Sequence, residues 1–289
     1  MITTTLKAWA YSAKNLITNL RALLMFAALY VLLLVTFYIF VSTREATMWQ
    51  VLVTYVLLIV IPAEFFVLQA AIIDAARALQ FSWKRILPHA FKIFLVTIPV
   101  LIVGWGLWYL VNKLAGRWPA PPLSPLALDP KSAKAAPVHW PTLLISTLRF
   151  ILFGVALPLA AIHLWIEVTA RDLRAIFAGG AKTFFKRIGN VMARALSSDS
   201  VFTYGLGLIA FALIPYLLLI LKINIKGTKT AFAAFILQVV LALLFALVGW
   251  IATIATLVRN AEQAPEAQQD VAPDISTGST PATQVLSPL

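Results

Sequence analysis

The sequence contains no cysteine, and charged residues make up only 12% of its 289 residues. Without cysteine, the chain has no disulfide, no thiolate metal ligand and no cysteine nucleophile. The HExxH, GxSxG, P-loop and EF-hand patterns are missing as well. The three histidines, at positions 89, 139 and 163, lie in separate regions, which argues against a histidine metal site. The sequence therefore predicts no catalytic residue, no metal site and no cofactor.

Apolar residues, in contrast, are abundant. They make up 61% of the chain, whereas a soluble domain averages about 45–50%. A core of this size cannot bury that excess, so lipid must cover part of it. The net charge of +12 comes from basic residues scattered over short loops. This pattern favours positive-inside topology and attraction to anionic lipids over nucleic-acid binding.

Six segments are long and apolar enough to cross a bilayer, which takes roughly 20 helical residues. They cover residues 22–41, 49–73, 93–112, 143–168, 201–221 and 231–258. The first apolar run is longer than the 7–15 residues or so of a typical signal-peptide core, so we interpret it as an uncleaved anchor. The sequence predicts an all-α, polytopic helical bundle in the membrane.

The distribution of lysine and arginine predicts the orientation. Most of these residues outside the spans fall in the N-terminal segment and in the loops 74–92 and 169–200. Positive loops stay in the cytoplasm. We therefore expect a bacterial cytoplasmic (inner) membrane protein with both termini inside, although the basic loop 222–229 departs from the rule.

The chain divides into three parts by composition. Residues 1–21 show helical spacing of apolar residues and predict a basic amphipathic helix at the interface. Residues 22–260 form the transmembrane domain, with a proline-rich outer loop at 113–142 and an amphipathic cytoplasmic loop at 169–200. Residues 261–289 are rich in Gln, Ala, Pro, Ser and Thr and predict a disordered tail.

Basic residues recur on one face of the loop 169–200. Lys182, Lys186 and Arg194 lie on a polar stripe at four-residue spacing, opposite an apolar stripe. They are candidate contacts to anionic lipids, and the segment is either a docking helix for a partner or lipid, or a connector resting on the bilayer.

Four prolines fall within spans and indicate kinks. Pro62 and Pro158 occupy similar places in the second and fourth spans, and Pro99 and Pro215 do so in the third and fifth. A Lys-Arg pair follows both the second and the fourth span. The second and third spans therefore resemble the fourth and fifth, as a hairpin repeat would.

Glu64 is the deepest acidic residue. With a rise of about 1.5 Å per residue, it lies roughly 4–5 Å from the centre of its span, His163 roughly 11 Å and Glu167 roughly 17 Å. An intramembrane carboxylate is costly when charged. Glu64 and His163 thus form a candidate intramembrane polar site, in which Glu64 is neutral or shares a proton with His163. The site either handles protons or cations, or satisfies a carbonyl freed by a proline.

Other polar residues of the spans have simpler interpretations. Glu167 is expected to pair with Arg171 four residues later, and Asp74 with Arg77 three residues later. Gln69 and Gln238 are expected to form hydrogen bonds between helices.

Basic cytoplasmic connectors between proline-bearing spans, over residues 15 to 260, resemble the membrane domain that accompanies bacterial glycerophosphoryl diester phosphodiesterases. The resemblance implies a membrane module without a hydrolytic domain, and it carries over no functional residue. We expect a non-catalytic membrane protein, a scaffold or accessory subunit. Its partners would be the bilayer, anionic lipids and other subunits of a membrane complex. The alternatives are a small transporter or channel using Glu64, and a membrane-embedded lipid enzyme.

Overall fold

The structure, a computed structural model, describes residues 2–43, 47–78, 81–118, 139–171, 189–221 and 227–269. Within these ranges it is helical and contains no strand. The elements that build the fold are α1 (Ile2–Thr18), α2 (Leu20–Ser42), α3 (Met48–Ala78), α4 (Trp83–Ala115), α5 (Trp140–Arg149), η2 (Phe150–Ala156), α6 (Leu157–Ala170), α9 (Ser198–Leu208), η3 (Ile209–Leu213), α10 (Ile214–Ile220) and α11 (Thr228–Gln269).

Six stretches of these helices are long and apolar enough to cross a membrane. They are Leu20–Ser42, Met48–Arg77, Trp83–Ala115, Trp140–Ala170, Ser198–Ile220 and Thr228–Glu262, each with a mean hydropathy of 2.1 or more. Five of them contain a whole predicted span. The remaining one, Ser198–Ile220, contains the predicted span 201–221 except for its last residue. The prediction of an all-α polytopic membrane protein is confirmed.

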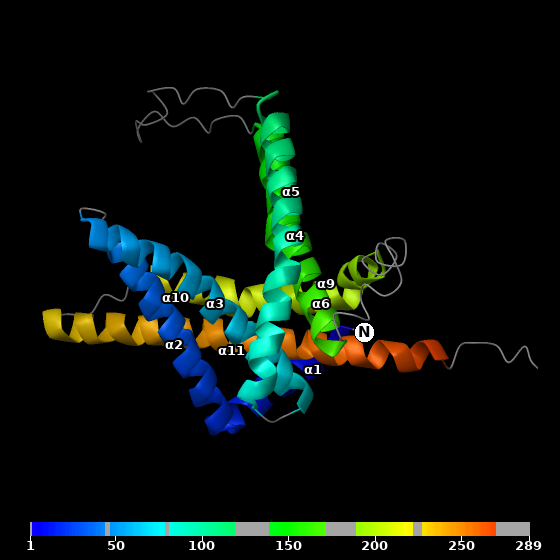
Figure 1. The fold of residues 1–289 in the computed structure, drawn as a ribbon, viewed down its shortest axis with the longest axis horizontal. Coiled ribbons are helices and arrows are strands. Elements are labelled where there is room, and N and C mark those ends of the chain that lie inside the picture. Colours follow the sequence, from blue (N-terminus) through cyan, green and yellow to red (C-terminus); the bar gives the residue numbers. More distant parts are fainter. Residues whose placement is uncertain are drawn as a thin grey trace, which may run out of the picture.

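The six spans form three antiparallel hairpins. The first is α2 with α3, the second is α4 with α5, η2 and α6, and the third is α9, η3 and α10 with α11. In Figure 1, α4 and α5 run side by side away from the centre, whereas α10 and α11 run side by side in another direction. The second and third hairpins thus diverge from a common centre.

The centre is a buried set of side chains that we call the hub. It comprises the buried side chains within residues 68–74 of α3, 86–97 of α4, 159–169 of α6, 200–204 of α9 and 251–258 of α11. Outside the hub, large apolar side chains of the hairpins point outward. Examples are Leu52, Ile59, Trp105, Tyr216 and Phe232. Protein contacts therefore cover the hub, and the outer halves of the hairpins are left for lipid or for other membrane helices.

Helix α1 docks on α11 and α9 near the hub. Its buried residues are Thr5, Ser12 and Leu16, while Leu6 and Ile17 from the predicted apolar face remain exposed. Small polar side chains therefore make much of the protein contact, and the exposed apolar residues stay free to contact lipid. The sequence pattern predicted the helix but not the face that docks.

Three predicted segments are partly outside the described residues. Helix α11 continues to Gln269, through the start of the segment expected to be a disordered tail, and residues 270–289 lie outside the description. The same holds for residues 119–138 of the outer loop and 172–188 of the cytoplasmic loop. Residues 189–195 of the latter are helical.

Two of the four prolines follow π-helical turns. η2 precedes Pro158 and η3 precedes Pro215, and each turn closes with a hydrogen bond from residue i to the carbonyl of residue i−5. A proline ring clashes with the carbonyl four residues earlier, and widening the preceding turn to π geometry accommodates that clash. Pro62 and Pro99 lie inside α-helices. Both proline pairs of the predicted repeat thus differ in local geometry.

Two glycines allow the third hairpin to pack closely. A Cβ atom at Gly207 of α9 would collide with the side chain of Thr253 on α11. A Cβ atom at Gly249 of α11 would lie 2.9 Å from the backbone nitrogen of Phe211. Small residues let membrane helices approach, and these two glycines allow α9 and η3 to pack closely on α11.

We predict that Gly207→Ala lowers the free energy of unfolding by about 1–3 kcal/mol, because the stiff, β-branched Thr253 cannot move aside freely. Gly205→Ala is the matched control on the same helix, since a Cβ atom there would meet no other atom within 4 Å. The thermal midpoint in detergent measures both. Equal midpoints for the two variants would show that the close approach does not stabilise the hairpin.

Candidate functional site

Glu64 lies in the middle of α3 and contacts the preceding helix. Its Oε1 accepts a hydrogen bond of 3.2 Å from the hydroxyl of Thr36 on α2. Its Oε2 is buried and has no hydrogen-bond partner among the described residues. The carboxyl group therefore links the two helices of the first hairpin through one oxygen and leaves the other available.

His163 lies in a different environment. It is 6% exposed, and its Nε2 has no hydrogen-bond partner in the described part of the chain. It lines a cavity of about 510 Å³, which we call the polar cavity. The lining comes from α1, α6, the 189–197 segment, α9 and α11, and consists of Thr4, Thr5, Ala8, His163, Arg194, Ser197, Asp199, Ser200, Asn260 and Ala261.

The structure shows no bond within the predicted pair, and it brings together two residues that were predicted for different roles. No described hydrogen bond or ion pair joins Glu64 to His163, and Glu64 does not line the polar cavity. Arg194, predicted as a lipid contact, lines the same cavity as His163. The other two predicted lipid contacts, Lys182 and Lys186, lie outside the described residues.

The expected local ion pairs form in one case out of two. Arg171 pairs with Glu167 at 2.8 Å, as predicted, and Arg194 lies 3.8 Å from the second oxygen of Glu167. Asp74, however, pairs with Arg85 of α4 at 3.3 Å, instead of with Arg77. The buried carboxylate of Asp74 thus pairs across the α3–α4 turn. The spacing of charges along the sequence did not predict Arg85 as its partner.

Arg77 instead joins three helices at the hub. Its Nη2 donates to the carbonyl oxygen of Ile166 at 2.6 Å, and its Nη1 donates to the hydroxyl of Thr169 at 2.9 Å, both on α6. Its Nε donates to Glu262 of α11 at 3.1 Å. The planar fork of a guanidinium suits several acceptors at once. Sequence reasoning missed this role, because its partners lie 89 residues or more away along the chain.

The two glutamines have the role predicted for them. Gln69 of α3 accepts a hydrogen bond of 2.9 Å from the indole of Trp250 on α11. Gln238 of α11 donates to the carbonyls of Leu218 and Leu221 in the third hairpin. Both link helices. A further link that was not predicted joins Trp165 to Thr97 at 2.9 Å within the second hairpin.

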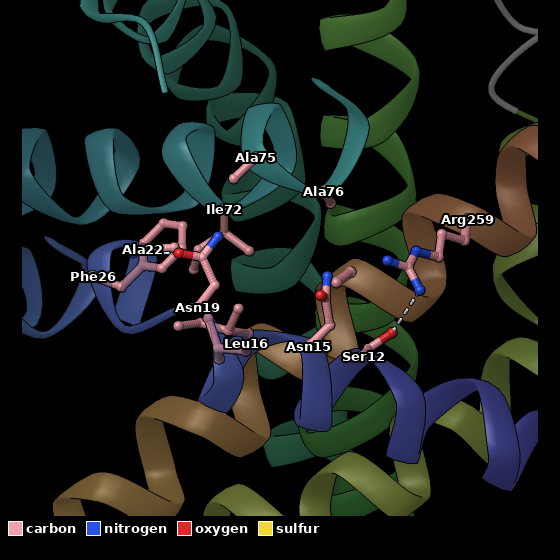
Figure 2. A pocket seen from close by; sticks show the side chains of 12 residues that line it. Ser12, Asn15, Leu16, Asn19, Ala22, Phe26, Ile72, Ala75, Ala76 and Arg259 are labelled. Carbon is pink, nitrogen blue, oxygen red and sulfur yellow. Dashed lines mark hydrogen bonds between the residues drawn. The ribbon is translucent and has the colours of Figure 1, made fainter. Parts of the chain in front are cut away.

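A small cavity of about 70 Å³ lies between α1, α2, α3 and α11. Figure 2 shows Ser12, Asn15 and Asn19 on one side of it, with the guanidinium of Arg259 at 3.4 Å from the Ser12 hydroxyl. A water molecule needs roughly 10–15 Å³ of such space, so this cavity suits a few waters that hydrate the α1–α11 contact.

An apolar cavity of about 510 Å³ lies between the first and second hairpins. Its lining is Leu33, Leu34, Phe37, Ile61, Pro62, Phe65, Phe66, Phe94, Thr97, Ile98 and Leu101. The only hydroxyl in this lining, that of Thr97, bonds to the carbonyl of Ile93 and accepts from Trp165. The two larger cavities therefore differ in chemistry, one apolar and one polar.

The chain offers no cluster of metal ligands in the part that the structure describes: no three His, Cys, Asp or Glu side chains are grouped there so that they could hold an ion. Comparison with known proteins gives no further assignment, because no family model, curated protein or solved structure matches the chain.

We predict that Glu64→Gln leaves the thermal midpoint unchanged, because an amide oxygen still accepts from Thr36. Glu64→Leu removes the acceptor and should lower the free energy of unfolding by about 1 kcal/mol. Both are measured by thermal unfolding in detergent, together with complementation of a deletion strain. A folded Gln variant that fails to complement would contradict the structural role and favour a proton or cation site.

Proposed function

We propose that the chain is a non-catalytic integral membrane protein that acts as a scaffold or accessory subunit. The observation that carries this proposal is the divergence of the second hairpin from the other two at one hub (Figure 1). Their outer halves turn large apolar side chains outward, as at Ile59 of α3, Trp105 of α4 and Phe232 of α11. Diverging helices offer faces that transmembrane helices of a partner can contact.

The surroundings of the acidic residues support a role other than catalysis. Asp74 pairs with Arg85, Glu167 with Arg171, and Glu262 with Arg77. Each of these three carboxylates has a cationic partner, and the pairs of Asp74 and Glu262 join different helices at the hub. Such groups stabilise a scaffold, whereas a general acid or base needs access to a substrate.

The proposal is tested by photocrosslinking in native membranes. A photoreactive residue replaces Ile59, Trp105 or Phe232 in separate variants, and the buried aromatic position Phe26, 2% exposed, serves as the control. We expect a discrete protein adduct from at least one exposed position and none from the control. Adducts with lipid alone at all three exposed positions would count against an accessory subunit.

We further propose that the chain lies in a bacterial cytoplasmic membrane with the hub on the cytoplasmic side. The contacts bring α1, the α3–α4 turn, the end of α6 and the end of α11 together at one end. The segments predicted to be cytoplasmic from their basic residues are therefore neighbours. Positive segments are retained in the cytoplasm, which supports this orientation.

The lack of native cysteine makes the orientation easy to measure. We predict that Thr47→Cys and Arg117→Cys, at hairpin tips, react with a membrane-impermeant maleimide in intact cells. Lys14→Cys on α1 should react only after the cells are permeabilised. The opposite pattern would place the hub outside.

A small transporter or channel is the second candidate function. It is favoured by the buried Oε2 of Glu64, which has no partner among the described residues. A transporter would need a pathway that passes Glu64. Glu64 lines neither the apolar nor the polar cavity. The complementation assay on Glu64→Gln separates this function from the scaffold.

A further inference from the structure

The polar cavity has a buried floor and an exposed rim. His163, Thr5 and Ser200 at the floor are each 7% exposed or less. Arg194 and Asp199 at the rim are exposed. The cavity opens at the hub, between the second and third hairpins, and its volume of about 510 Å³ is within the range of small-molecule sites.

His163 gives the floor an unmet hydrogen-bonding requirement. Its Nε2 is buried without a partner in the described structure, and such a group is unfavourable unless it is satisfied. A neutral imidazole can donate from one ring nitrogen. A ligand with an acceptor oxygen that reaches the floor would meet this requirement.

Two further features at the rim favour an anionic group on that ligand. Arg194 lies against the cavity, and its nearest acid, Glu167, is 3.8 Å away and already pairs with Arg171 at 2.8 Å. The cavity also meets the N-terminus of α9, where Ser197 is the N-cap and accepts from the backbone N–H of Ser200. A helix N-terminus carries partial positive charge and binds phosphate groups.

Asp199 adds the opposite charge. It lies in the first turn of α9 and lines the same cavity as Arg194. A purely anionic ligand would be repelled by this carboxylate, whereas a ligand that also carries a cation would pair with it. The rim thus matches a zwitterion, with its anion near Arg194 and its cation near Asp199.

The depth of the cavity indicates where such a ligand comes from. His163 lies seven residues, or about 10 Å, before the last residue of α6. Head groups occupy a layer just outside the roughly 30 Å hydrocarbon core. The ligand is therefore within reach of the membrane surface at the hub.

We propose that the polar cavity binds the head group of an aminophospholipid. Its phosphate contacts Arg194, His163 and the N-terminus of α9. Its primary ammonium group, which can donate hydrogen bonds to a carboxylate as a trimethylammonium group cannot, contacts Asp199. The assignment does not depend on the accessory-subunit function, because a scaffold and a transporter are equally able to hold such a lipid.

The test uses the full chain in detergent after exchange has removed bound lipid. Dioleoyl-phosphatidylethanolamine, -phosphatidylglycerol and -phosphatidylcholine are titrated separately, and the thermal midpoint is followed by tryptophan fluorescence. We expect phosphatidylethanolamine to reach half its effect at a concentration at least tenfold lower than the other two lipids. O-phosphoethanolamine is titrated in parallel as the free head group.

The variants separate this site from general lipid binding. Arg194→Gln should weaken the phosphatidylethanolamine effect at least tenfold, while Arg117→Gln, at the remote end of the second hairpin, should not change it. Asp199→Asn should abolish the preference over phosphatidylcholine. His163→Leu should also weaken binding, and if it fails to fold, the exposed Arg194 and Asp199 still decide the test.

Two results would overturn the proposal: equal effects of the three lipids, or an effect of phosphatidylethanolamine that Arg194→Gln leaves intact. If O-phosphoethanolamine binds as tightly as the lipid and with the same sensitivity to the variants, the head-group chemistry is supported and the source is the free phosphoamine. A much weaker effect of the free head group identifies the lipid as the source.

Discussion

The hub depends on the guanidinium of Arg77. Three of its nitrogens contact acceptors on α6 and α11, including the backbone carbonyl of Ile166. Arg77 binds near the C-terminus of α6, whose partial negative charge favours a cation. Three residues earlier on α3, Asp74 pairs with Arg85 on α4. The last two turns of one helix thus connect four helices drawn from all three hairpins.

The membrane explains why polar contacts have this role. Lipid tails are as apolar as the side chains they replace, so burial alone drives little association between membrane helices. Close packing of small residues and hydrogen bonds must supply it. Both are concentrated at or beside the hub, in the contact of Gly207 with Thr253 and in the bond from Trp250 to Gln69. Beyond the hub the hairpins have no comparable contact with one another among the described residues, and they diverge.

The sequence predicted those features that lipid determines directly. Hydropathy and length located all six spans, because side chains that face lipid must be apolar whichever helices become neighbours. The sequence also predicted that Gln69 and Gln238 form hydrogen bonds between helices, because an amide within a span must find a partner. The i, i+4 pair of Glu167 with Arg171 was predictable because helix geometry alone brings the two together.

What the sequence did not predict depends on which helices become neighbours. Arg77 pairs with Glu262, 185 residues later, and no local spacing encodes that choice. The pattern on α1 selected its apolar face, whereas packing buried small polar residues. His163 and Arg194 were each chosen as candidates for separate reasons. That they line one cavity follows from the packing of α6 against α9, which periodicity does not show.

Each hairpin carries its own polar link outside the hub. Thr36 bonds to Glu64 in the first, Arg149 bonds to Asn112 at 2.8 Å in the second, and Gln238 bonds to the carbonyls of Leu218 and Leu221 in the third. Among the described residues, none of these links joins one hairpin to another. The helices within a hairpin are thus fixed to each other, while the angle between hairpins is set at the hub. A motion that changes this angle leaves every one of those links intact. The polar cavity lies between the second and third hairpins and the apolar cavity between the first and second, so whatever fills either cavity acts directly on that angle.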